Sequence, residues 1–154
     1  MNPDPNAPRL AASDDLARTP ALSQELLAEL IKTAQRKTFP RNTIVVLEGD
    51  IAETLYVILE GTVRVYVADE HGKEAELNVM GPGEYFGELM LGSQRRTASV
   101  KTLTPARFCV VQRPDFERVL ADAPDIAFHV IHTLIHRIRV LTNSVSNLAL
   151  MDVY

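Results

Sequence analysis

The chain has 154 residues, of which 46% are hydrophobic and 23% are charged, a size and composition typical of one globular domain. Its net charge of −4, from 16 Lys and Arg against 20 Asp and Glu, argues against a stand-alone nucleic-acid binder, because such proteins carry a basic excess. The single cysteine excludes an internal disulfide, a cysteine-held iron–sulfur cluster and a zinc knuckle. No apolar leader and no apolar run of about 20 residues occur, so we expect a cytoplasmic protein without a membrane span.

The N-terminal part predicts a tail followed by a helix. The first twenty residues contain four of the nine prolines and little apolar periodicity, so we expect a mobile tail over residues 1–18. Apolar residues then recur at helical spacing from Leu22 to Ile31, and Ser23 is a suitable N-cap. This segment predicts an amphipathic helix of about three turns.

The middle of the chain predicts β-structure. All seven glycines lie between residues 49 and 92, and stretches rich in β-branched and aromatic residues lie between and after them. These stretches are residues 43–47, 55–59, 63–67, 74–79, 98–103 and 106–111. Short strands with frequent turn signals are typical of an antiparallel sandwich or roll. We therefore predict a mainly-β fold, an antiparallel double-stranded β-helix (jelly-roll-like β-roll) over about residues 38–112 within a domain spanning residues 19–123.

The C-terminal part predicts a short helix and then a long one. Residues 114–120 suit the short helix, and residues 124–154 suit a long helix that begins near Pro124. Its apolar positions step by three and four: Ile131, Leu134, Ile138, Leu141, Val145 and Leu148. β-branched residues at one set of positions and leucines at the other favour a parallel two-stranded coiled coil, and hence a homodimer. The alternative is a single helix that buries the same stripe against its own β-roll.

Chemistry-bearing residues cluster between Gly83 and Val100. Gly87 lets a backbone approach a ligand closely, and amides at a short helix start after it favour an anion. Arg96 supplies a planar fork for phosphate oxygens, whereas Glu88 would repel phosphate and is suited to accept hydrogen bonds from sugar hydroxyls. The combination suits a ligand with ribose and phosphate. The alternative is a surface loop with a Glu–Arg pair that contributes at most about 1 kcal/mol.

Two motifs carry a resemblance to a known family. Phe86-Gly87-Glu88-Leu89 followed by Arg96-Thr97-Ala98 resembles the phosphate-binding cassette of cyclic-nucleotide-binding domains. The order of β-roll, short helix and long dimerising helix is similar to the Crp/Fnr family of bacterial transcription regulators, over about residues 22–154. The resemblance implies that Glu88 binds the ribose 2′-hydroxyl and that Arg96 and Thr97 hold the cyclic phosphate. The implied nucleotide-binding set is Gly87, Glu88, Leu89, Met90, Arg96, Thr97, Ala98 and Thr142.

The base is implied to lie against the long helix. A well-studied member of the family contacts the base with two adjacent hydroxyl residues of that helix, one of them from the other subunit. The matching positions here are Leu141 and Thr142, so one hydroxyl is kept and the other is lost. Arg95 also stands where proline often precedes the arginine. Cyclic AMP is the expected ligand, and the alternatives are another effector such as a cyclic dinucleotide, or a dimerisation module without ligand.

The resemblance also implies a role within a longer protein. Residues 147–154 resemble the hinge before the family's DNA-binding domain. We therefore expect a non-catalytic sensor and dimerisation unit that needs no cofactor or metal. DNA contact is expected only through a domain absent from this chain.

The remaining candidate residues favour structural interpretations. His129, His132 and His136 have the spacing of metal ligands, but outer-face helical histidines are usually solvated or half-buried. A remote alternative is a cupin-like metal enzyme, which would need two or three histidines on inward-facing strands. The only histidine of the predicted roll is His71, which lies in a turn, so the sequence argues against this alternative. Cys109 is interpreted as a buried thiol, and Tyr56, Tyr66, Phe108 and Phe116 as core residues.

Two further pairs flank the candidate site in sequence. Tyr85 and Phe86 are interpreted as anchors of the cassette rather than ligand contacts. Arg137 and Arg139 are interpreted as part of a solvated face of the long helix.

Overall fold

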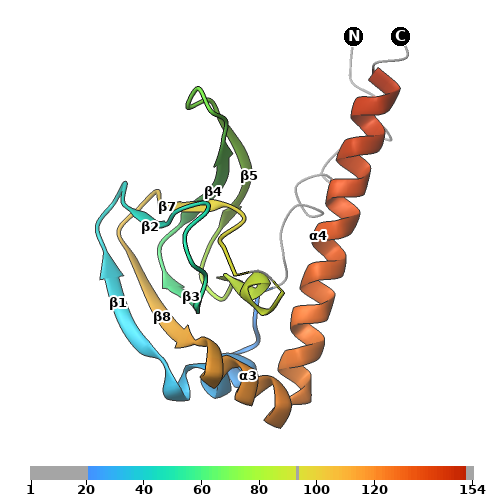
Figure 1. Cartoon of the computed structure of the whole chain (residues 1–154). Coiled ribbons are helices and arrows are strands. Elements are labelled where there is room, and N and C mark those ends of the chain that lie inside the picture. The colour runs from blue at the N-terminus through green and yellow to red at the C-terminus, as the bar shows by residue number, and fades with distance from the viewer. Residues whose placement is uncertain (1–20, 93, 152–154) are drawn as a thin grey trace, which may run out of the picture.

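The computed structural model describes residues 21–92 and 94–151. The tail predicted over residues 1–18 and the last three residues of the predicted hinge lie outside these ranges. The described chain forms two four-stranded antiparallel sheets, with short helices at one end of the sandwich and a long helix along one side (Figure 1). This confirms the predicted mainly-β roll with a short helix and a long C-terminal helix.

The elements follow one another without long connections. In chain order they are α2 (Gln24–Leu30), the 3₁₀ turn η1 (Ile31–Thr33), β1 (Gln35–Phe39), β2 (Ile44–Val46), β3 (Thr54–Glu60), β4 (Val63–Ala68), β5 (Glu74–Met80), β6 (Tyr85–Phe86), the 3₁₀ turn η2 (Glu88–Leu91), β7 (Ser99–Thr102), β8 (Ala106–Gln112), α3 (Arg113–Asp122) and α4 (Pro124–Met151). One sheet has the strand order β1-β8-β3-β6 and the other has the order β2-β7-β4-β5.

Strands β3 and β8 form the centre of the first sheet and are buried on both faces. Successive side chains of a strand point to opposite faces. In β3, Tyr56 and Ile58 contribute to an apolar cluster between the two sheets, whereas Leu55 and Val57 contribute to a second cluster beneath the helices. The β8 strand alternates in the same way, with Phe108 in the first cluster. The sheet therefore lies between two cores, and its side chains pack into both.

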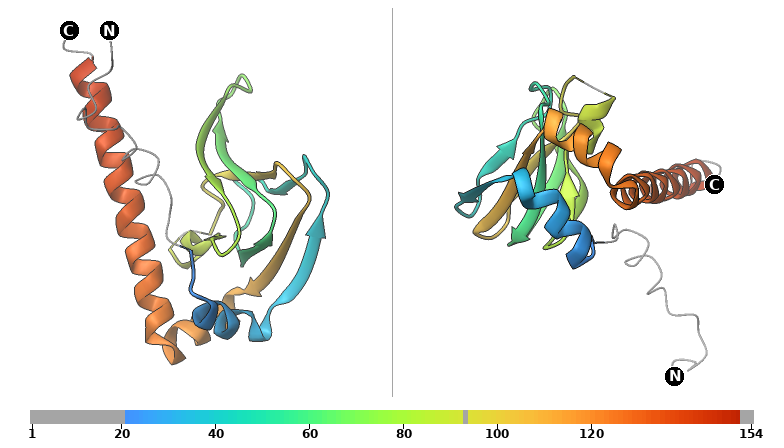
Figure 2. Two further views of the ribbon diagram at one scale, coloured as in Figure 1. Left: turned by 180° about the vertical axis from the view of Figure 1, so that it is seen from behind. Right: turned by 90° about the horizontal axis from the view of Figure 1, so that it is seen from below.

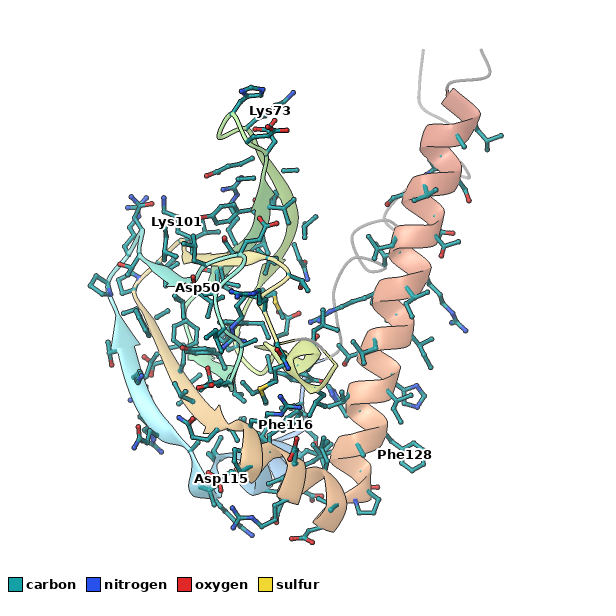
Figure 3. All side chains as sticks on the ribbon, viewed as in Figure 1. Asp50, Lys73, Lys101, Asp115, Phe116 and Phe128 are labelled. Atoms are coloured by element: carbon teal, nitrogen blue, oxygen red, sulfur yellow. The ribbon has the colours of Figure 1, made fainter. Side chains whose placement is uncertain are left out.

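The helices close one end of the sandwich and run along its side. The α2 helix begins at Ser23, whose Oγ accepts a hydrogen bond from the Leu26 amide at 3.3 Å. It spans seven residues before the tighter η1 turn, so it is shorter than the three turns predicted. Phe116 of α3 is fully buried and points into the core under the sheet (Figure 3).

The α4 helix begins at Pro124, near which the sequence predicted its start, and is 28 residues long. Ile126 and Val130 in its first turns are buried in the core beneath the helices. The helix then continues along the side of the roll and beyond it (Figure 2). No helix in the described part of the chain combines the length and the apolar character needed to cross a membrane.

Two short strands were not predicted from the sequence. The β1 strand is polar and largely exposed, and it forms because its backbone pairs with β8, where Lys37 lies opposite Phe108. The β6 strand has only two residues, which is too short for a periodicity. Both are formed by pairing with neighbours distant in sequence rather than by a local pattern.

The turn between β3 and β4 generates a test of the packing. Gly61 has a φ of +90°, and a Cβ placed there would lie 2.4 Å from the carbonyl oxygen of Pro105. Gly61→Ala should lower the free energy of unfolding by about 2 kcal/mol or more, since the left-handed backbone alone costs an L-residue about 1–2 kcal/mol and the clash adds to it. Urea unfolding followed by circular dichroism measures the change.

Gly72 provides the matched control for that substitution. It has a φ of +80°, but nothing lies within 4 Å of a Cβ added there. Gly72→Ala should therefore show only the backbone cost. Equal losses for the two variants would contradict the tight packing of Gly61 against the loop before β8.

Candidate functional site

The cassette begins where β6 ends. Gly87 has a φ of 99° and starts the η2 turn, in which the Met90 amide donates to the Gly87 carbonyl oxygen at 3.1 Å. A Cβ at Gly87 would lie 2.7 Å from the carbonyl oxygen of Thr54 and 2.8 Å from Nη1 of Arg96. Any side chain there would separate the cassette from β3 and displace Arg96. A glycine at this position is therefore required by close packing as well as by the backbone angle.

Arg96 presents a half-buried positive charge to the same place. Its Nη1 donates to the Thr54 carbonyl oxygen at 2.9 Å, and its Nη2 donates to Thr54 Oγ1 at 2.8 Å. Among the described residues no carboxylate forms an ion pair with Arg96. Burial lowers the pKa of the guanidinium because desolvation disfavours its charged form. An anion bound beside Arg96 would offset this desolvation.

The backbone around Arg96 is held by an adjacent segment. The Arg96 amide donates to the Asp50 carbonyl oxygen at 2.8 Å, and the Gly49 amide donates to the Arg96 carbonyl oxygen at 2.9 Å. Ile51 and Arg95 form an isolated antiparallel bridge between these two segments. Two loops distant in sequence thus fix the second half of the cassette.

Glu88 is buried at the start of η2. Its side chain is 1% exposed and forms an ion pair with Arg137 of α4. Neither carboxylate oxygen accepts a well-directed hydrogen bond from the described part of the protein. Buried polar atoms are normally hydrogen-bonded, so this carboxylate has acceptor capacity for the hydroxyl groups of a ligand.

The interpretation of Arg137 as part of a solvated helix face was wrong. Its guanidinium turns inward to Glu88, and Nη2 also donates to the Tyr85 carbonyl oxygen at 3.4 Å. Burial lowers the pKa of Arg137, again through desolvation. A signal was present in the sequence, because Val130, Thr133, Arg137 and Val140 lie three and four residues apart and form the inward stripe of α4.

Tyr85 joins the cassette strand to α4 by hydrogen bonds. Its hydroxyl lies 3.0 Å from Thr133 Oγ1 and 2.9 Å from His129 Nδ1. Burial raises the pKa of the phenol. The neighbouring Phe86 ring stacks on Tyr56 with centroids 5.1 Å apart. Both residues therefore anchor the cassette, one to α4 and the other to the core between the sheets, and Phe86 also lines the cavities described next.

Two adjoining cavities lie over the cassette. The first, here called the cassette cavity, has a volume of about 80 Å³ and is lined by Arg137 and by seven of the predicted site residues. These seven are Gly87, Glu88, Leu89, Met90, Arg96, Thr97 and Ala98. The second, here called the helix cavity, has a volume of about 340 Å³ and lies between the roll and α4. Both are lined by Phe86, Leu89, Thr97 and Arg137, so the two cavities adjoin each other at these residues.

The structure places Thr142 outside both cavities of its own chain. Its hydroxyl donates to the Ile138 carbonyl oxygen at 2.8 Å, and it lies with Ile138 and Val145 on an outward side of α4. Leu141, by contrast, lines the helix cavity. The role of Thr142 in binding the base stays a prediction that depends on a second copy of the chain.

The predicted apolar seam of α4 is largely exposed in the single chain. Ile131, Ile138, Leu141 and Val145 are between 49% and 64% exposed. Leu134 differs, because it packs partly on the chain's own core, and the side chain of Leu148 lies outside the described residues. The alternative in which a single helix buries this whole stripe on its own roll is therefore wrong. Phe128 extends the exposed apolar surface and points away from the roll (Figure 3).

The other candidate residues have structural environments. Cys109 is 1% exposed, and burial raises the pKa of its thiol, which disfavours the reactive thiolate. His132 is exposed, whereas His129 and His136 are half-buried. Within residues 21–92 and 94–151, no three side chains of the metal-binding types come together.

Comparison with known proteins agrees with this geometry. The sequence profile of the family described as "Cyclic nucleotide-binding domain" matches residues 36–123. The cAMP-activated global transcriptional regulator CRP of Pasteurella multocida is 35% identical over 117 residues, which cover 75% of this chain and 56% of the relative. A CRP-like cAMP-activated global transcriptional regulator of Mycobacterium tuberculosis is 34% identical over 128 residues, covering 82% of this chain and 57% of the relative.

Solved structures show the same relationship. The catabolite activator protein of Thermus thermophilus has a TM-score of 0.75 and 26% identity, with 83% of this chain and 61% of that chain covered. The c-di-GMP responsive global regulator CLP of Xanthomonas campestris also has a TM-score of 0.75, with 25% identity and coverage of 82% and 65%. The chain spans little more than half the length of the curated relatives named above, which are regulators of transcription and not enzymes. The chain therefore belongs to the cyclic nucleotide-binding domain family and is related to the Crp/Fnr regulators.

Proposed function

We propose that this chain is the effector-binding domain of a Crp/Fnr-type transcription regulator and that its effector is a cyclic mononucleotide, with cyclic AMP the first choice. The observation that carries the proposal is a pair of opposite charges, the buried Glu88 and the half-buried Arg96, that line one cavity. Arg96 has no ion-pair partner among the described residues, and Glu88 has unfilled acceptor capacity. A cation and a carboxylate so placed match a phosphate and a sugar hydroxyl.

In the bound state Arg96 would pair with the cyclic phosphate while Glu88 accepts the ribose 2′-hydroxyl. The base would then extend into the helix cavity, which is the larger of the two spaces and adjoins the first. The relatives from P. multocida and M. tuberculosis are cAMP-activated, which supports cyclic AMP. The CLP regulator responds to c-di-GMP and has an equally similar structure, which supports a cyclic dinucleotide as the second candidate.

The ligand would act on α4 through Glu88. Because this carboxylate is paired with Arg137, a hydroxyl that hydrogen-bonds to it changes a contact between the roll and the long helix. A ligand shifts a conformational equilibrium only by binding one arrangement more tightly than the other. In the longer regulator this shift would orient a DNA-binding domain, and the exposed seam of α4 would pair with a second copy to form a homodimer.

Substitution of Arg96 tests the phosphate contact. Arg96→Gln should weaken binding of cyclic AMP about tenfold to a hundredfold, since a hydrogen bond to a charged group contributes about 1.5–3 kcal/mol and about 1.4 kcal/mol corresponds to a factor of ten. Isothermal titration calorimetry measures the affinity. Arg107→Gln removes the same charge from the roll at an ion pair with Glu60, away from both cavities, and should bind as the wild type does. A folded Arg96→Gln variant with undiminished affinity would refute the phosphate contact.

A ligand analogue tests the role of Glu88. The wild type should bind 2′-deoxy cyclic AMP about tenfold more weakly than cyclic AMP, because the carboxylate loses a charge-assisted hydrogen bond. In Glu88→Gln this difference should shrink, since an amide oxygen is a weaker acceptor. Comparing two ligands on the same variant cancels the separate effect of breaking the ion pair with Arg137. If both proteins discriminate equally, the sugar hydroxyl does not contact Glu88.

The exposed seam of α4 predicts the oligomeric state. The chain should sediment as a dimer, and Ile138→Asp should convert it to a monomer without unfolding, because this side chain is 62% exposed in the single chain. Arg139→Asp is the control: it introduces an aspartate at the next residue of the helix, which lies outside the apolar seam, and it should leave the dimer intact. Analytical ultracentrifugation distinguishes the two, and an unchanged dimer in Ile138→Asp would exclude this interface.

A further inference from the structure

One polar side chain in the helix cavity has no partner. Nε2 of His136 is shielded from solvent and makes no hydrogen bond with any residue that the structure describes. Nε2 of His129 is buried as well, but the ring of His129 is held by its Nδ1 at 2.9 Å from the Tyr85 hydroxyl, and His132 is exposed. Of the three histidines singled out by their spacing, only His136 lines the cavity between α4 and the roll.

The walls around His136 are mainly apolar. Val65, Leu77, Val140 and Leu141 contribute to them, and the volume is about 340 Å³. A buried donor or acceptor without a partner costs about 1–3 kcal/mol, so an apolar side chain would be the more stable choice here. An apolar slot with a few placed polar groups is the usual form of a small-molecule site.

The position of the two cavities indicates which part of a ligand would meet His136. Arg96 and Glu88 line the cassette cavity, whereas His136 lines only the helix cavity. Arg137, next to His136 in sequence, lines both and carries the ion pair with Glu88. Arg137 therefore marks the boundary between the two cavities. A nucleotide with its sugar at Glu88 would have its base in the helix cavity, on the side of His136.

We propose that His136 is the specificity-determining residue of this site, and that its Nε2 hydrogen-bonds to a ring nitrogen of the nucleotide base. This inference rests on the proposed function. It also accounts for Leu141, where the hydroxyl expected from the resemblance is absent. In this chain Leu141 supplies apolar wall for the base, and His136, five residues earlier on the same helix, supplies the polar contact.

The test compares base analogues on matched variants of the whole chain. The probes are cyclic AMP and its deaza analogues, in which N1, N3 or N7 is replaced by C–H. The wild type should bind at least one analogue about tenfold more weakly than cyclic AMP. His136→Leu should lose this discrimination, and His136→Gln, which retains a nitrogen donor near the position of Nε2, should keep part of it. His132→Leu changes the same residue type at an exposed position and should discriminate as the wild type does.

The outcomes separate this inference from the proposed function. If the wild type binds none of these nucleotides, the proposed function itself fails. If the wild type binds cyclic AMP and all three deaza analogues equally, or if His136→Leu discriminates as the wild type does, the role of His136 is overturned while the function stands. Thermal unfolding without ligand provides an independent check, since His136→Leu removes an unpartnered polar atom and should be at least as stable as the wild type.

Discussion

Strands β3 and β8 have no face in solvent, and this constraint determines where the functional residues can lie. Their side chains alternate between two cores, one shared with the second sheet and the other shared with the helices. The cassette follows β6, which pairs with β3 at the edge of this central sheet. The turn after β6 is therefore next to both cores, since Tyr85 packs in one and Phe86 in the other. A charged residue of this turn such as Glu88 is buried, and the adjoining cavity lies between the turn and α4.

Polar contacts at this edge connect the cassette to the middle of α4. The first turns of the helix pack through apolar residues such as Ile126 and Val130. Further along, the contacts change in kind: Tyr85 hydrogen-bonds to Thr133 and lies against His129, and Glu88 pairs with Arg137. Hydrogen bonds and ion pairs are directional and are sensitive to a competing ligand, whereas apolar packing is not. The roll thus holds the start of α4 firmly and contacts its middle through groups that a ligand can redirect.

Local patterns predicted most of the fold, and the family resemblance implied the cassette side of the site. Glycine spacing and β-rich stretches predicted the central strands, and the resemblance carried by the cassette motif implied seven residues that line one cavity. Strand β1 was missed because Gln35–Phe39 has no apolar alternation and depends on pairing with β8. Arg137 was misinterpreted because the inward stripe of α4 on which it lies was overlooked, and because its partner Glu88 lies on a different element with no fixed spacing from it in sequence. The exposure of the α4 seam can be understood from the sequence alone. The seam has heptad spacing, and a separate stripe of the same helix faces the roll, so the seam residues are left largely exposed in the single chain.

The length of α4 has a mechanical consequence. Its 28 residues correspond to about 42 Å, at about 1.5 Å per residue. Arg137 lies thirteen residues after Pro124, at about 20 Å along this axis, so a tilt of about 5° around the start of the helix displaces the arginine by about 2 Å and the far end by about 4 Å. For such a tilt the helix is a rigid arm that pivots at its first turn, where Ile126 packs into the core. A rearrangement at Glu88 no larger than the length of one hydrogen bond is doubled at the end of the helix.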